Sequence, residues 1–202
     1  MGLAAELHLS LDPGSGYPSP LQLSAYEAGI HIMTKKPRLT TIGYEGASLT
    51  AFISTLTASG VTLLLDVREL PVSRRKGFSK TPLSQALASA GISYRHERAF
   101  GAPKAVRHRL RADGDFKRYF TDFREYLGTQ SLLLDQVAES ITGCVALLCF
   151  ERNPAECHRS VVVAALARRL KIEFTHLTVS TDDAKQTPAR SRSHPRQGLS
   201  AA

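Results

Sequence analysis

The 202-residue chain has a mass of 22.0 kDa, 43% hydrophobic residues and 22% charged residues, which is typical of one soluble globular domain. No run approaches the roughly 20 apolar residues of a membrane-spanning helix, so the sequence excludes an integral membrane protein. The three cysteines are too few for a disulfide scaffold, and polar residues interrupt the N-terminal apolar ones. We therefore expect a cytoplasmic protein with reduced thiols, no secretory signal and no membrane partner.

Composition divides the chain into three regions. Residues 1–37 contain the turn-rich run DPGSGYPSP and are predicted to be a poorly ordered extension, with Met33 as a candidate true start. Residues 38–178 are predicted to form a single α/β domain. Residues 179–202 are rich in Ser, Thr, Arg and Pro and almost without large apolar residues, so we predict a disordered basic tail.

Apolar runs and capping signals predict alternating strands and helices within the domain. In the final predicted helix, Asn153 is the expected N-cap, Pro154 stands at the first helical position and Glu156 completes a capping box. In chain order we predict a strand at 39–44, a helix at 48–60, a strand at 61–67, a helix at 81–91, a strand at 92–96, helices at 115–128 and 130–141, a strand at 144–150, a helix at 153–170 and a strand at 173–177.

This alternation implies right-handed crossovers and a mainly parallel sheet. We predict a three-layer, Rossmann-like α/β fold with helices on both faces of the sheet. Ligands of such sheets bind outside the carboxyl ends of the strands. Three distant segments end there and supply the candidate site, namely Tyr44 after the first strand, Asp66, Arg68, Ser73 and Arg74 after the second, and Cys149, Glu151, Cys157, His158 and Arg159 after the most apolar one.

Two of the cysteines are candidate catalytic residues. Cys157 is expected near a helix N-terminus beside His158, and positive charge there favours the nucleophilic thiolate. Cys149 is the second candidate nucleophile, and His158 and Glu151 are candidate proton-transfer groups. A purely structural interpretation stays open for both cysteines, since a buried cysteine often acts as a small hydrophobe.

The candidate substrate-binding residues are mostly basic. Arg68, Arg74 and Arg159 are predicted to bind an anion, because guanidinium groups match phosphate and carboxylate geometry. Ion pairs with neighbouring acids are the alternative. Asp66 is flanked by apolar residues, so we expect it to be buried and to orient Arg68. Ser73 and Tyr44 complete the set, although Tyr44 is equally suited to packing.

Cysteine and histidine are also zinc ligands, but the sequence gives little reason to predict a metal. No fourth ligand is evident beside Cys149, Cys157 and His158, and no CxxC spacing occurs. Adjacent Cys and His side chains on one helix would also point in different directions. We therefore expect neither a metal nor another cofactor.

Positive charge is concentrated in one part of the chain. The formal net charge is +8, and residues 68–118 contain thirteen Lys and Arg but only four acidic residues. Such a segment favours an anionic partner, for example a phosphate-bearing substrate or nucleic acid. A basic surface that serves only solubility is the alternative.

Several motifs together resemble the domain-of-unknown-function family 488 over about residues 39–177. They are TIGY ending at Tyr44, the Asp-Val-Arg that ends at Arg68, the aromatic run FKRYFTDFREYL, and LLCFERNPAECHRS around Cys149. The family usually has His in place of Tyr44 and Gly-Gly in place of Gly101-Ala102. The resemblance implies a fold and a site at these residues, and no established reaction.

A weaker likeness is to rhodanese-like sulfurtransferases and cysteine phosphatases. These enzymes carry a cysteine at a strand end, in an anion-binding loop that closes with Arg-Ser, as Cys149 and Arg159-Ser160 would here. Nine residues lie between Cys149 and Arg159, more than a tight phosphate loop contains. The likeness therefore implies similar chemistry only.

Three functions are compatible with these features, and the sequence favours the first. The first is an enzyme that uses one of its cysteines to act on an anionic substrate. The second is a non-catalytic nucleic-acid-binding protein, in which the basic run at 104–111 with Lys117 and Arg118 contacts phosphates and aromatic residues stack on bases. The third is a protein-interaction domain whose polar cluster only forms structural ion pairs.

Overall fold

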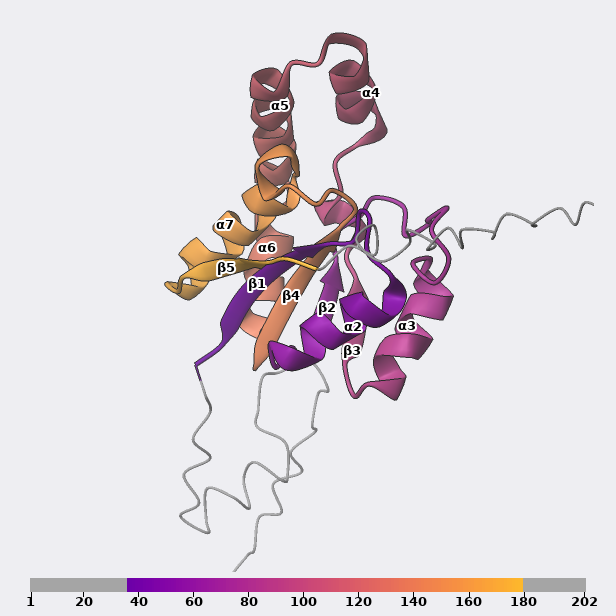
Figure 1. Ribbon diagram of the computed structural model, residues 1–202. Coiled ribbons are helices and arrows are strands. Elements are labelled where there is room, and N and C mark those ends of the chain that lie inside the picture. Colours follow the sequence, from indigo (N-terminus) through magenta and orange to yellow (C-terminus); the bar gives the residue numbers. More distant parts are fainter. Residues whose placement is uncertain (1–35, 180–202) are drawn as a thin grey trace, which may run out of the picture. The chain divides into compact units, whose positions relative to one another are not determined.

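The computed structural model describes residues 36–179, which form five strands, six α-helices and two short 3-10 helices (Figure 1). The predicted extension with Met33, and all but the first residue of the predicted basic tail, lie outside the described residues. The strands are β1 (Arg38–Gly43), β2 (Leu63–Asp66), β3 (Ser93–His96), β4 (Cys144–Cys149) and β5 (Phe174–Leu177).

The strands form one sheet in the order β3-β2-β4-β1-β5, and every neighbouring pair is parallel. This confirms the predicted parallel sheet. Strand β4 lies between β1 and β2 although it follows β3 in the chain, so the segments after these three strands are neighbours. The sheet thus brings together the three strand ends at which the sequence placed the candidate site.

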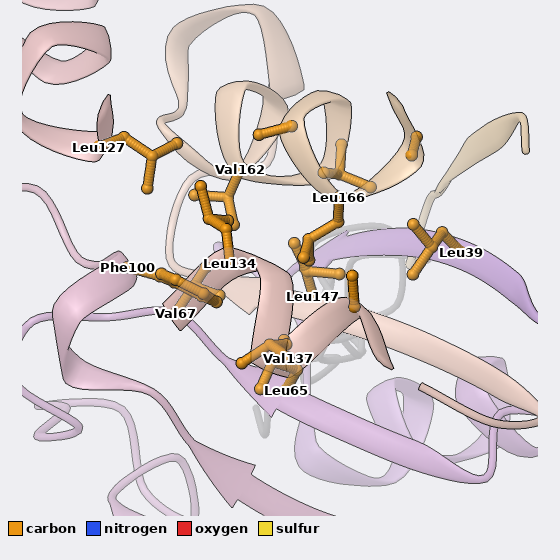
Figure 2. Close-up of a cluster of buried hydrophobic side chains, with 14 of the residues drawn as sticks. Leu39, Leu65, Val67, Phe100, Leu127, Leu134, Val137, Leu147, Val162 and Leu166 are labelled. Carbon is orange, nitrogen blue, oxygen red and sulfur yellow. The ribbon is translucent and has the colours of Figure 1, made fainter. Parts of the chain in front are cut away.

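Helices cover both faces of the sheet, as predicted for a three-layer fold. Alternate residues of β4 point to opposite faces. Ala146 and Leu148 pack with α2 (Leu49–Ala58) and α3 (Lys80–Ser89). On the other face, Leu147 packs with three helices, where Figure 2 shows Val162 and Leu166 of α7 above it. Those helices are α5 (Phe116–Gly128), α6 (Ser131–Ser140) and α7 (Arg159–Leu170).

The helix predicted at 153–170 is in fact two separate elements. A 3-10 helix, η2 (Pro154–Glu156), begins after Asn153, whose side chain accepts a hydrogen bond from the backbone of Ala155. Cys157 is then extended, with φ −124° and ψ 133°, and α7 begins after His158. The capping signals at Asn153 are real, but they start a single short turn instead of the long helix.

A further helix, α4 (Lys104–Asp113), was not predicted from the sequence. It buries none of its residues, so it lacks the apolar periodicity by which a helix is recognised. It ends at Gly114, where φ is 68°, and it packs against α5 (Figure 1). Among residues 36–179, no helix is both long enough and apolar enough to cross a bilayer.

Candidate functional site at the strand ends

A cavity of about 920 Å³ lies at the carboxyl ends of the three central strands. Its wall combines the segments after β1, β2 and β4 with residues of α4 and α5, and most of the predicted site residues belong to it. The wall is formed by Tyr44, Glu45, Gly46, Arg68, Glu69, Leu70, Val72, Ser73, Arg74, Arg75, Ala102, Arg107, Leu110, Arg111, Tyr119, Cys149, Phe150, Glu151, Glu156 and His158.

Four of the predicted residues form a compact group, the Cys149 cluster, which consists of Cys149, Glu151, Cys157 and His158. Their ligand atoms all lie within 4.8 Å of one another. Cys149 Sγ donates a hydrogen bond to Glu151 Oε2 at 2.9 Å and lies 3.7 Å from His158 Nδ1. His158 Nε2 lies 2.8 Å from the carbonyl oxygen of Val67 and must donate to it. In the neutral ring, Nδ1 is therefore the nitrogen with a lone pair.

Two close backbone contacts hold the cluster in place. A Cβ atom on Gly43, the last residue of β1, would lie 1.9 Å from the carbonyl oxygen of Glu151, so only glycine permits this approach. The guanidinium of Arg159 donates to the carbonyl oxygens of Glu151 and Arg152, the latter at 2.9 Å. Both contacts fix the short segment that carries Glu151 away from β4.

Burial controls the protonation of the cluster. It raises the pKa of Cys149, and it raises that of Cys157 well above the ordinary value. Burial alone would raise the pKa of Glu151 as well. Hydrogen bonds from both thiols outweigh this effect, so the pKa of that carboxyl group is lowered. Burial alone would lower the pKa of His158. The interactions of its ring with Cys157 and with the Val67 carbonyl outweigh this effect, so the pKa is raised. The thiolate expected at Cys157 from its place before a helix is therefore disfavoured.

The geometry contradicts two of the sequence-based reasons for expecting no metal. Cys157 and His158 precede α7 instead of lying along it, and the extended backbone at Cys157 turns both side chains toward Cys149. Glu151 supplies the fourth ligand atom that the sequence did not reveal. Among residues 36–179, this is the group of cysteine, histidine and acidic side chains that converges closely enough to hold a metal ion.

A second buried group at this edge, the Asp66–Arg68 network, is nearly saturated with internal hydrogen bonds. Asp66 is fully buried and accepts from Arg68 Nε at 2.8 Å and Nη2 at 2.5 Å, and from the hydroxyl of Tyr94 at 2.7 Å. Arg68 Nη1 donates to the hydroxyl of Tyr44 and the carbonyl of Phe78. Asp66 thus orients Arg68, as predicted.

This saturation changes the roles of two predicted anion ligands. Four of the five N–H groups of Arg68 are already bonded within the protein, so it cannot form a bidentate pair with a substrate. Arg159 is 1% exposed and absent from the cavity wall, and its guanidinium binds Thr41 and two backbone carbonyls. The prediction that Arg159 binds substrate is therefore replaced by a role in holding the loop.

Other arginines line the cavity instead. Arg74 and Arg111 are exposed, and neither forms an ion pair within the described part of the chain. The guanidinium of Arg75 donates from Nε to the backbone carbonyl of Ala47, and Arg107 forms an ion pair with Glu69. Residues 104–111 were expected only to bind nucleic acid, because neither α4 nor its contact with the cavity is evident from the sequence.

Comparison with known proteins agrees with the resemblance found in the sequence. The family model described as Domain of unknown function DUF488 matches residues 48–166, which is more than half of the 202-residue chain. The match includes the whole Cys149 cluster, whereas Gly43 and Tyr44 precede it. A search of curated proteins and a search of solved structures each found no match. The chain belongs to the DUF488 family.

Proposed function

We propose that this protein is an enzyme that binds a phosphate-bearing anionic substrate in the strand-end cavity and transforms it in a cysteine-dependent transfer or hydrolysis reaction. One observation carries the proposal: a single cavity wall contains both exposed arginines and three members of the Cys149 cluster, namely Cys149, Glu151 and His158. A binding module needs only the arginines, and a structural ion-pair cluster needs no cavity. The combination of the two is characteristic of an active site.

The anion would be bound by the arginines at the rim. Arg74 follows β2 and Arg111 belongs to α4, so the two approach the cavity from different segments. Both are exposed and without an ion-pair partner among residues 36–179, which leaves their N–H groups available to phosphate oxygens. A small phosphate-bearing molecule fits a cavity of about 920 Å³.

The reactive side of the cavity is formed by Cys149 and the groups that contact it. Cys149 belongs to the wall, whereas Cys157 is 0% exposed and does not. A substrate can therefore approach the sulfur of Cys149 and not that of Cys157. Glu151 accepts the hydrogen bond of the Cys149 thiol, and His158 Nδ1 lies 3.7 Å from the same sulfur. These two groups are suited to moving a proton during the reaction.

A non-catalytic nucleic-acid-binding protein is the alternative, and the basic character of α4 favours it. However, three basic residues in this region form ion pairs, Arg107 with Glu69, Arg109 with Asp122 and Arg118 with Asp113. These pairs reduce the positive charge that a phosphate backbone would meet. Binding to DNA or RNA that weakens steeply with rising salt, without any turnover, would favour this alternative.

Calorimetric titration with pyrophosphate and nucleotides tests the binding step. We expect the double substitution Arg74→Gln and Arg111→Gln to weaken binding by at least about tenfold to hundredfold, since even one hydrogen bond to a charged group contributes about 1.5–3 kcal/mol. Arg109→Gln is the matched control, because Arg109 lies on the same helix as Arg111 but outside the cavity wall. Equal losses in both proteins, or no binding by the wild type, would contradict the proposal.

Turnover of phosphoesters by the full chain tests the catalytic step. Cys149→Ser should abolish turnover of p-nitrophenyl phosphate or of whichever nucleotide binds. Cys144→Ala should not, because Cys144 packs in the core on the opposite face of the sheet. Turnover that persists in Cys149→Ser would show that the reaction does not depend on this cysteine.

A further inference from the structure

Beyond this function, we propose that the Cys149 cluster binds a zinc ion. The cluster offers the sulfurs of Cys149 and Cys157, a ring nitrogen of His158 and a carboxylate oxygen of Glu151. Thiolate, imidazole and carboxylate are the three ligand types of zinc, and four such ligands complete its tetrahedral coordination. The set comes from two segments that meet only in the folded protein, the end of β4 and the turn before α7.

The spacing of the ligand atoms fits this ion. Ligands that lie about 2.0–2.3 Å from a tetrahedral zinc ion are about 3.3–3.8 Å from one another. Cys149 Sγ and His158 Nδ1 are 3.7 Å apart, and all four ligand atoms lie within 4.8 Å. Cys149 Sγ and Glu151 Oε2 are closer, at 2.9 Å, because a thiol proton joins them. A small outward shift of the Glu151 carboxylate gives the tetrahedral spacing.

The surroundings of the ligands support the same assignment independently of their spacing. His158 donates its Nε2 proton to the Val67 carbonyl, the arrangement that orients metal-binding histidines and leaves the other nitrogen for the metal. The backbone N–H of Arg159 points at Cys157 Sγ at 3.5 Å, where it can stabilise thiolate charge. The side chain of Arg159 holds the segment that carries Glu151.

The donor set also selects among metals. Magnesium and calcium prefer sites made only of oxygen ligands, so two sulfurs disfavour them. Zinc accepts sulfur, nitrogen and oxygen together. Its binding replaces the protons of the two thiols, which pass to solvent, and changes no oxidation state.

The site does not depend on the substrate of the proposed enzyme, and zinc binding can be measured without one. With zinc bound, Cys149 is a ligand, and the reaction would depend on this cysteine through the metal. Glu151 is the half-buried ligand while the other three are buried. Cys149, Glu151 and His158 all line the cavity, and the carboxylate is the most exposed of the three, so it is the ligand that a substrate oxygen could replace.

The experiment measures metal bound to the full-length protein, purified in a phosphine reductant from cells grown with added zinc. We expect about one zinc ion per chain by mass spectrometry, and a chelator titration gives its affinity. Cys149→Ser and Cys157→Ser should each lower that affinity by more than the roughly 10–100-fold that loss of an outer-shell partner costs. Cys144→Ala should leave it unchanged, because Cys144 lies on the other face of the sheet.

Replacement of zinc by cobalt provides a readout that needs no variant to fold. The wild type should show intense thiolate-to-cobalt charge-transfer absorption and the visible bands of tetrahedral cobalt. A wild type that holds no zinc and lacks this absorption overturns the proposal, and so does zinc that all three cysteine variants retain equally. Neither result bears on anion binding by Arg74 and Arg111, so failure of the metal site and failure of the substrate proposal remain distinguishable.

Discussion

The Asp66–Arg68 network and the Cys149 cluster are both buried polar groups at the same edge of the sheet, yet their hydrogen bonds differ. In the network, the Asp66 carboxylate is surrounded by hydrogen-bond donors, and four of the five N–H groups of Arg68 donate to partners within the protein. In the cluster, sulfur, nitrogen and oxygen atoms with lone pairs face one another. A buried polar group whose hydrogen bonds are all formed within the protein stabilises the fold. Lone pairs that converge on one point can instead bind a proton, a metal ion or a substrate.

The largest expected effect comes from breaking the network. Asp66→Asn removes the charge that balances the buried Arg68, whose side chain is 6% exposed beside a fully buried carboxylate. We expect a loss of about 3–5 kcal/mol in the free energy of unfolding, measured by urea denaturation. Zinc affinity of the folded fraction should not change, since no atom of Asp66 contacts the cluster in the hydrogen bonds of the network.

The exposed ion pair between Arg109 and Asp122 is the matched control. Asp122→Asn removes a charge of the same kind where the arginine side chain is 54% exposed, and we expect a loss of less than about 1 kcal/mol. A similar small cost for Asp66→Asn would mean that the network does not stabilise the fold, and the contrast between the two buried groups would disappear.

A smaller loss of stability, with a clear effect on the cluster, is expected for Gly43→Ala. The new methyl group would lie 1.9 Å from the carbonyl oxygen of Glu151, so the segment that carries Glu151 must move. We expect a cost of about 1–3 kcal/mol, as for other overpacked sites, and zinc affinity lower by at least about tenfold. Thermal denaturation and the chelator titration measure the two effects.

Gly128→Ala is the control for this substitution. Nothing lies within 4 Å of a Cβ atom added to Gly128, at the end of α5. Alanine there should raise stability by up to about 1 kcal/mol through its higher helix propensity, without any change in zinc affinity. If Gly43→Ala binds zinc as tightly as Gly128→Ala does, the close approach of β1 does not position Glu151.

The sequence predicted the strands, both helical layers and the edge of the sheet that carries the site. These features follow from local patterns, such as the apolar run that forms β4 and the capping serine at the start of α2. The order of the strands could not be predicted, because the insertion of β4 between β1 and β2 depends on tertiary packing. The convergence of the three strand ends was therefore an expectation until the topology was known.

Individual roles within the site were harder to predict than its place. Arg68 and Arg159 have side chains that commonly bind anions. Only the hydrogen bonds in the structure show that their guanidinium groups already donate to partners within the protein. Glu151 was predicted as a proton-transfer group, but its position beside two sulfurs depends on the extended backbone of Cys157. The extended φ and ψ of Cys157 separate a helix-borne Cys-His pair from a cluster of four converging side chains, and the local sequence does not specify these angles.

Apart from the control variants, the smallest effect is expected at Tyr44, which belongs to both the network and the cavity wall. The hydroxyl of Tyr44 accepts from Arg68 Nη1 at 3.0 Å, and its ring stacks on Phe78 with centroids 4.4 Å apart. Tyr44→Phe keeps the stacking and removes one hydrogen bond, so we expect a cost of about 1 kcal/mol in urea denaturation. Zinc affinity and pyrophosphate affinity should both stay at the wild-type value, because Arg68 keeps its bonds to Asp66 and Phe78. A loss of pyrophosphate affinity in this variant would instead make the Tyr44 hydroxyl a substrate contact and extend the functional site into the network.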